Sequence, residues 1–225
     1  MAALSSIAGT LAGMALGSVD LRIPLVSGGA GFLVLAVITS FTMPETGFRP
    51  APAHTRNPFA AMAETARAGF RAIRSSPVLI ALIVITVIMG AHSEGYDRLR
   101  DAQLIRTVGL PGPFEPVVWI GIFNIAASLV GAGANRLLER RIRSIARPGL
   151  PLAIATVGIG GFITLLALTR DITLAVPAII LTGALRRTAA PLTGAWTNRN
   201  ISSQTRATVL SFYGQADSLG QVAFG

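Results

Sequence analysis

Long apolar runs separated by short polar connections dominate the pattern of this chain. Residues 4–19, 24–43, 77–96, 117–137, 148–168 and 173–196 are almost entirely apolar, and a further mixed run begins at residue 206. Most of these runs have the roughly 17–25 residues that an α-helix needs to cross a bilayer. Connections such as residues 20–22 and 170–171 allow only tight antiparallel turns. The pattern therefore predicts an all-α polytopic membrane bundle of about seven transmembrane helices.

The composition agrees with a bilayer as the solvent of this chain. Of the 225 residues, 52% are hydrophobic and only 13% are charged, whereas soluble domains carry roughly 25% charged residues. A soluble domain of this length needs more polar side chains to cover its surface. The lipid bilayer is therefore the first predicted partner.

The basic residues are all arginines, and their distribution predicts the topology. A net charge of +9 can indicate nucleic-acid binding, but these arginines lie between the apolar runs, so nucleic acid is not a predicted partner. Connections 44–76, 135–148 and 197–206 hold 12 arginines and three acids, against five arginines and six acids in connections 20–22, 92–116 and 170–171. The positive-inside rule then predicts a multi-pass protein of the inner or plasma membrane with a cytoplasmic N-terminus.

The longest polar stretch, residues 44–76, divides the chain into two helical groups. Within it, apolar side chains recur at helical spacing from Phe59 to Ile73, and arginines line another face at Arg67, Arg71 and Arg74. This pattern is typical of an amphipathic helix at a membrane surface. We therefore expect one group in residues 1–43, a cytoplasmic connecting loop in 44–76, and a second group in 77–225.

Small residues in the first run predict a helix–helix contact. Gly9, Gly13 and Gly17 recur every four residues, which places them on one helix face. Such a face lets a neighbouring membrane helix approach closely, although glycine is also simply tolerated in membrane helices. We expect another helix to pack there.

Pro44, Glu45 and Thr46 directly follow the second apolar run, and a strongly basic segment follows the fourth. These segments resemble the major facilitator superfamily of transporters. In that family, a Pro-Glu-Thr segment often stands where the sixth helix ends. The basic segment around residues 131–141 is similar to the family's loop motif, with Asn135 in place of the usual aspartate and Leu138 in place of the usual glycine. The matching positions of this loop motif are Asn135, Arg136, Arg140 and Arg141. Residues 94–99 and 206–211 also resemble segments of bacterial members.

The resemblance implies both a fold and a function. It aligns residues 1–43 with the last two helices of the N-terminal bundle and residues 77–225 with a truncated C-terminal bundle, so that the chain covers helices five to eleven. It implies transport of a small solute or drug, often proton-coupled, with further helices supplied by a companion or longer chain. An inactive truncated membrane protein is the alternative.

Polar residues within apolar runs are the candidate translocation residues, because they are costly in a bilayer unless they pair or serve a function. Glu94 and Asp97 share one face of the third run, where an interfacial cap is the alternative for Glu94. Asn124 belongs to a polar stripe of the fourth run, for which core hydrogen bonding is the alternative. Asp217, with Gln215 on a neighbouring face, falls near the bilayer centre and is a candidate for coupling or substrate contact.

Two adjacent arginines lie well inside the last complete run. Arg186 shares its helix face with small and polar residues, including Thr182 and Thr193, whereas Arg187 points about 100° away. We therefore expect Arg186 to face a cavity and Arg187 to snorkel towards the inner headgroups. The alternative is that both arginines snorkel.

Enzymatic chemistry has little support in this sequence. Cysteine is absent and only two histidines occur, so we predict no metal site. No Ser/His/Asp constellation or phosphate-cradling loop is present, and Gly131 and Gly133 lack the third glycine of a dinucleotide site. We therefore expect no catalytic residue and no cofactor; an integral membrane enzyme is a weak alternative.

Overall fold

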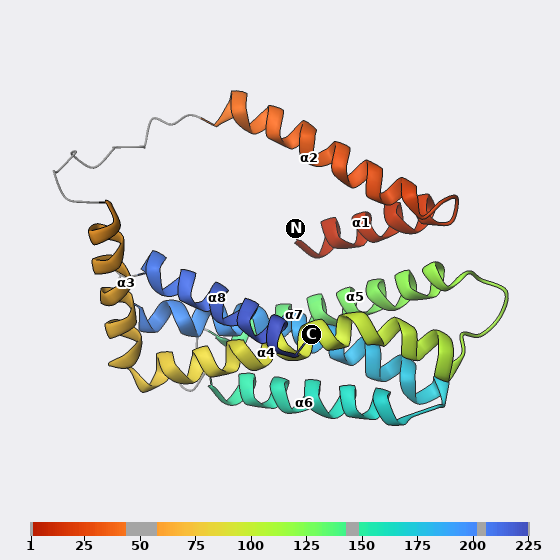
Figure 1. Ribbon diagram of the computed structural model, residues 1–225. Coiled ribbons are helices and arrows are strands. Elements are labelled where there is room, and N and C mark those ends of the chain that lie inside the picture. Colours follow the sequence, from red (N-terminus) through yellow and green to blue (C-terminus); the bar gives the residue numbers. More distant parts are fainter. Residues whose placement is uncertain (1, 44–57, 143–148, 202–205, 225) are drawn as a thin grey trace.

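The computed structural model describes residues 2–43, 58–142, 149–201 and 206–224, and these ranges are helical with no strand (Figure 1). The prediction of an all-α chain is confirmed. In chain order the elements are α1 (Ala2–Gly17), α2 (Arg22–Thr42), α3 (Pro58–Arg74), α4 (Pro77–Gln103), the π-helix η2 (Leu104–Val108), α5 (Pro116–Ile142), α6 (Gly149–Leu168), α7 (Ile172–Asn200) and α8 (Arg206–Phe224).

Five helical segments are long and apolar enough to cross a membrane. They are Arg22–Thr42, Pro77–Val108, Pro116–Leu138, Gly149–Leu168 and Ile172–Asn200. Apolar helix α1 is shorter, and α8 is not among the five. The fold is therefore compatible with a multi-pass membrane protein, but these five segments do not confirm the predicted count of seven.

The helix that begins with the third apolar run is much longer than the run itself. The apolar run ends at Tyr96, yet α4 continues to Gln103 and η2 carries the helix on to Val108. Gly109 then ends it with φ 81° and donates its N–H to the Leu104 carbonyl at 2.9 Å, a conformation that favours glycine. Residues 97–108 contain neither glycine nor proline, so nothing in them interrupts the helix.

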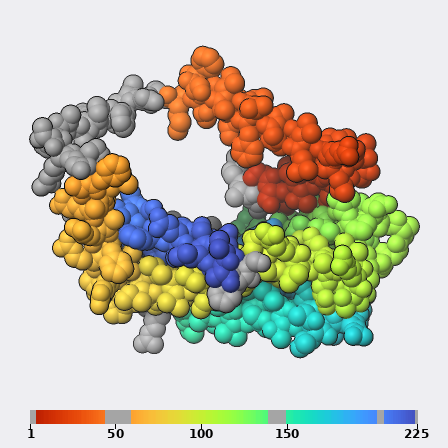
Figure 2. Space-filling model, viewed as in Figure 1, coloured from red at the N-terminus to blue at the C-terminus, as the bar shows by residue number. Residues whose placement is uncertain are grey.

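The helices form two packed groups. In the first, α8 lies along α4, and α3 packs against both of them across one end (Figure 1). In the second, α7 packs against both α5 and α6, and α1 lies along α5. Helix α2 contacts α1 and has no buried residue. The space-filling view shows α2 standing clear of α8 (Figure 2).

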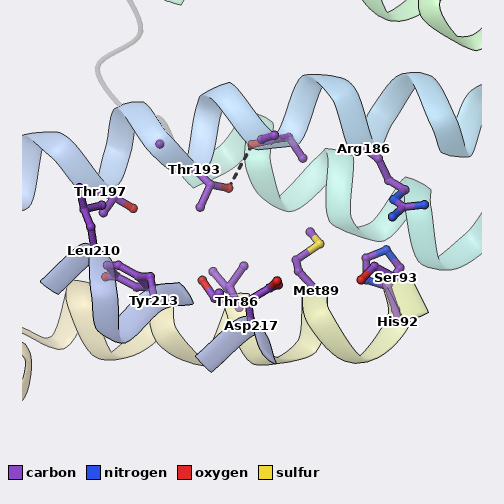
Figure 3. A pocket seen from close by; sticks show the side chains of 14 residues that line it. Thr86, Met89, His92, Ser93, Arg186, Thr193, Thr197, Leu210, Tyr213 and Asp217 are labelled. Carbon is purple, nitrogen blue, oxygen red and sulfur yellow. Dashed lines mark hydrogen bonds between the residues drawn. The ribbon is translucent and has the colours of Figure 1, made fainter. Parts of the chain in front are cut away.

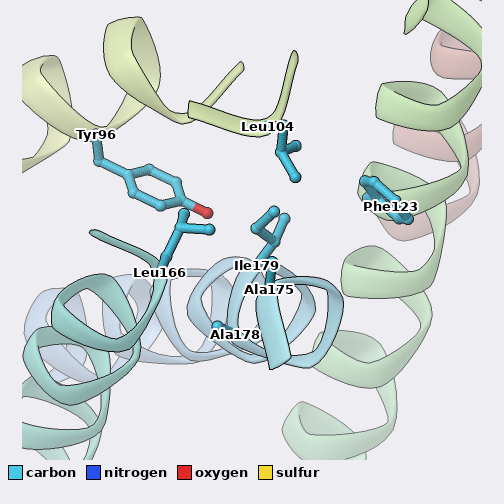
Figure 4. Close-up of a cluster of buried hydrophobic side chains, with 7 residues drawn as sticks. All are labelled: Tyr96, Leu104, Phe123, Leu166, Ala175, Ala178 and Ile179. Atoms are coloured by element: carbon cyan, nitrogen blue, oxygen red, sulfur yellow. The ribbon is translucent and has the colours of Figure 1, made fainter. Parts of the chain in front are cut away.

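A shared hydrophobic cluster joins the two groups at the end of α4. Tyr96 and Leu104 pack with Phe123 of α5, Leu166 of α6, and α7 (Figure 4). On α7 the cluster uses Ala175, Ala178 and Ile179, all at most 2% exposed. Small alanines let the neighbouring helices approach α7 closely.

The prediction that another helix packs on the glycine face of α1 is wrong at Gly9 and Gly13. No described atom lies within 4 Å of a Cβ built at Gly9 or Gly13, and Gly17 meets only ordinary contacts. Instead, the Met14 side chain of α1 inserts against Gly121 of α5, where a Cβ would lie 2.0 Å from its sulfur. The small residue that permits this contact therefore lies on the partner helix.

Helix α3 falls within the stretch predicted to be amphipathic. Ile73 is buried against α4 and α8, while Arg67, Arg71 and Arg74 are exposed. Met62 and Phe70 are more than half exposed, so part of the apolar face remains accessible in the described structure. The Pro44-Glu45-Thr46 signature lies outside the described residues, and the division into three domains stays a prediction.

Two glycines bring the backbones of α4 and α8 into direct contact. A Cβ at Gly90 would lie 2.2 Å from the Asp217 carbonyl oxygen, and one at Gly220 would lie 2.1 Å from the Val87 carbonyl oxygen. Carbons do not approach oxygens that closely, so a side chain at either position would force the helices apart. These contacts hold Asp217 beside α4.

We expect Gly220→Ala to destabilise the protein, because overpacking of this kind costs about 1–3 kcal/mol. The matched control is Gly214→Ala on the same helix, where a Cβ meets no atom within 4 Å and alanine is the better helix former. Thermal unfolding in detergent, followed by circular dichroism, should show a lower Tm for the first variant only. Equal Tm values for the two variants would contradict this account of the α4–α8 contact.

Candidate functional site

A bidentate ion pair connects the two groups of helices. The Nη1 and Nη2 atoms of Arg186 on α7 donate to Oδ1 and Oδ2 of Asp97 on α4, at 2.6 and 2.9 Å. Paired contacts of this kind combine charge with a fixed geometry and are the stronger class of hydrogen bond. The backbones of α4 and α7 approach each other at few points, so these side chains bridge the interval between them.

An aromatic ring and a second arginine extend this pair along α4. The Tyr96 ring centroid lies 5.4 Å from Cζ of Arg186 and 5.7 Å from Cζ of Arg100, within the range of cation–π attraction. Arg100 Nε donates to Asp101 Oδ1 at 2.7 Å, and its Nη1 donates to Asn124 Oδ1 of α5 at 3.4 Å. The network therefore links α4, α5 and α7.

These groups line a cleft of about 480 Å³ between α4, α5 and α7. We call it the arginine cleft. Its polar lining consists of Tyr96, Asp97, Arg100, Asn124, Arg186 and Arg187, and its remaining lining is Ala127, Ile179, Gly183 and Ala190. The lining therefore combines charged side chains with apolar and small ones.

A second cleft of about 440 Å³ lies between α4, α7 and α8. We call it the threonine cleft, because Thr86, Thr193 and Thr197 line it. Figure 3 shows Arg186 at one end and Thr197 at the other, with Asp217 between them. Asp217 Oδ2 accepts a hydrogen bond from Gln221 Nε2 at 2.8 Å. Arg186 lines both clefts.

The structure brings together some of the sequence candidates and separates others. Asp97, Asn124 and Arg186 share the arginine cleft, and Asp217 lines the threonine cleft. Glu94 pairs with Arg98 along the outside of α4 and lines neither cleft. Gln215 is exposed on α8 and also lies away from both clefts.

The loop-motif residues lie beyond the clefts, towards the end of α5. Asn135 Nδ2 donates to the Arg187 carbonyl oxygen at 3.3 Å and so joins α5 to α7. Arg136 is exposed. The side chains of Arg140 and Arg141 lie outside the part of the chain that the structure describes.

Arg187 does not extend as the sequence suggests. Its Nη1 donates to the Gly183 carbonyl at 3.1 Å, one turn back towards the start of α7, and the side chain lines the arginine cleft. The interpretation of this residue as an anchor towards the far end of the helix is therefore wrong. Helical side chains lean towards the N-terminus of their helix, which returns this one to the same cleft as Arg186.

Sequence reasoning missed Tyr96 and Arg100 as parts of the site. The end of the apolar run at Tyr96 suggests a loop immediately after it, in which Arg100 would face water. The absence of glycine and proline until Gly109 is the signal that the helix continues. A helix of that length places Tyr96 and Arg100 on one face, because residues four apart are neighbours.

Comparison with known proteins does not assign this chain to a family. No protein-family model matches the chain, and no curated protein or solved structure matches it significantly. Inferences about function therefore rest on the residues and their arrangement.

We expect Asp97 and Arg186 to be energetically coupled. The single variants Asp97→Asn and Arg186→Gln each leave an unpaired partner, whereas the double variant leaves none. A double-mutant cycle of unfolding free energies should therefore give a coupling of about 0.5–3 kcal/mol.

The Glu94–Arg98 pair is the control for that cycle. The Arg98 side chain is 71% exposed, and pairs one turn apart on a helix surface contribute only about 0.2–0.5 kcal/mol. A coupling for Asp97–Arg186 no larger than that of the control pair would show that the bridge does not join the helices energetically.

Proposed function

We propose that this chain forms part of a secondary transporter of the major facilitator type, which moves a small solute across a membrane. The Asp97–Arg186 pair carries the proposal. A charged bridge between two helices that are each long enough to cross a bilayer is expensive unless it serves a function. Transport needs such polar groups between spans, because a solute that crosses must exchange its contacts with water for contacts with protein.

The two clefts support the same interpretation. They lie on either side of Arg186, and each has roughly the volume of a small-molecule site. A side chain that lines both can interact with a solute from either one. Asp217 is the residue we assign to proton coupling, because it is the carboxylate among the residues that line the second cleft.

Unburied apolar surface supports the expectation of further helices. Large apolar side chains on α2, such as Phe32, Leu33 and Phe41, are 72–86% exposed, and no residue of α2 is buried. Lipid or companion helices would cover such a surface. In this proposal α1 and α2 belong to one bundle of an inner or plasma membrane protein with a cytoplasmic N-terminus, and α4 to α8 belong to the other.

Transport can be tested in the native setting of the chain. Membrane vesicles from the source cells would be incubated with an equimolar mixture of anionic, neutral and cationic metabolites, and the accumulated solutes measured by mass spectrometry. We expect at least one solute to accumulate beyond vesicles from a deletion strain. Arg186→Ala should reduce that accumulation about tenfold or more, because it removes the charged group that lines both clefts.

Arg98→Ala is the matched control for this experiment. It removes an arginine from α4 that lines neither cleft, so accumulation should remain near the wild-type level. If wild-type and deletion vesicles accumulate the same solutes to the same level, the transport proposal is wrong and the inactive-protein alternative stands.

A further inference from the structure

We propose that the arginine cleft binds a small oxyanion, a carboxylate or a phosphate, at the guanidinium of Arg187. If the oxyanion is the transported solute, this inference rests on the proposed function. The binding site itself can be tested without transport. It follows from the charges in the cleft, the free donors of Arg187 and the space beside them.

The charges that line the cleft do not balance. Three guanidinium groups line it, from Arg100, Arg186 and Arg187, against the single lining carboxylate of Asp97. Asp97 is held by Arg186, and Arg100 has its own partner in Asp101. One positive charge is therefore unmatched within the described residues.

The unmatched charge is that of Arg187. The one hydrogen bond of its guanidinium to a described residue goes to the Gly183 carbonyl, and the guanidinium forms no ion pair with any residue in the described ranges. A guanidinium has five N–H donors, so most of its donors are unused. The Arg187 side chain is exposed, so an anion that enters the cleft can reach these donors.

The neighbours of Arg187 favour an oxyanion over other ligands. The guanidinium fork matches two oxygens of a carboxylate or a phosphate. Asn124 accepts from Arg100 through Oδ1, which leaves its amide N–H groups able to donate into the same cleft. Asp97 binds Arg186 through both of its oxygens, and it forms no ion pair with Arg187.

A missing side chain leaves room for this arrangement. A Cβ built at Gly183 would lie 3.2 Å from Arg187 Nη1 and 2.8 Å from Ala127 Cβ. Any other residue at this position would therefore crowd the guanidinium. The cleft of about 480 Å³ holds a small molecule but not a large one.

Binding can be measured on the purified full chain in lipid nanodiscs. Thermal unfolding would be followed at constant ionic strength with inorganic phosphate or succinate as the probe, and with glucose and tetramethylammonium as neutral and cationic controls. A ligand that binds only the folded state raises Tm in a saturable way. We expect phosphate or succinate to do so and both controls to have no effect; which anion acts identifies the chemical source.

Three variants distinguish the site from a general effect of anions. Arg187→Gln should weaken the apparent affinity about tenfold to a hundredfold, which corresponds to losing a charged hydrogen bond. Arg187→Lys, which keeps the charge but loses the fork, should be intermediate. Arg98→Gln should bind as the wild type does. Without anion, Arg187→Gln should keep the wild-type Tm or gain stability, which checks its folding.

The outcomes separate this inference from transport itself. Equal stabilisation of wild type and Arg187→Gln, or no saturable stabilisation by either anion, overturns the oxyanion site. Vesicles that accumulate only neutral or cationic solutes overturn the anionic substrate class but leave transport standing. Saturable binding that depends on Arg187, together with inert vesicles, supports the site and removes transport.

Discussion

The two clefts of this protein meet at one charged contact, the pair between Asp97 and Arg186. The helices that pack on α4 and those that pack on α7 form separate groups. Apolar packing joins them around Tyr96 and Leu104 at the end of α4, around Met89 midway along that helix, and around Trp196. Between these contacts lie the two clefts. The ion pair adds to the packing and crosses the space that the clefts occupy.

The cost of charge in an apolar setting explains how the remaining polar groups are arranged. Arg100 is only 16% exposed through its side chain, and it is matched by Asp101, Asn124 and the Tyr96 ring. Buried or half-buried guanidinium groups require this degree of satisfaction, since desolvation costs several kcal/mol per ion. Arg187 is exposed, so it does not need the same degree of satisfaction. Its donors remain available on the lining of the arginine cleft, where an anion can approach them.

The helices could be predicted from the sequence, but their ends and their partners could not. Hydropathy averages over a window, and it places the apolar runs because a bilayer demands them. Hydropathy does not predict the helix after Tyr96. Averaged over a window, charged residues that pair with another helix have the same hydropathy as charged residues in a loop. The candidates Asn124 and Arg186 could be named from their positions within apolar runs, and Asp97 from its place on the same helix face just after one. That Asp97 meets Arg186 could not, because 89 residues separate the two in the chain and no local pattern encodes their contact.

The two adjacent arginines of α7 have different roles because of helix geometry. Their Cα–Cβ directions differ by about 100°, which suggests that only one of them can enter a given cavity. The Arg187 side chain is long and leans towards the N-terminus of the helix, so it still reaches the cleft that Arg186 lines. The absence of a side chain at Gly183 leaves room for the Arg187 guanidinium there. One turn of helix then supplies a guanidinium neutralised by Asp97 and another that is not. Because the first is already paired, an anion can approach the second without breaking the contact that joins the helices.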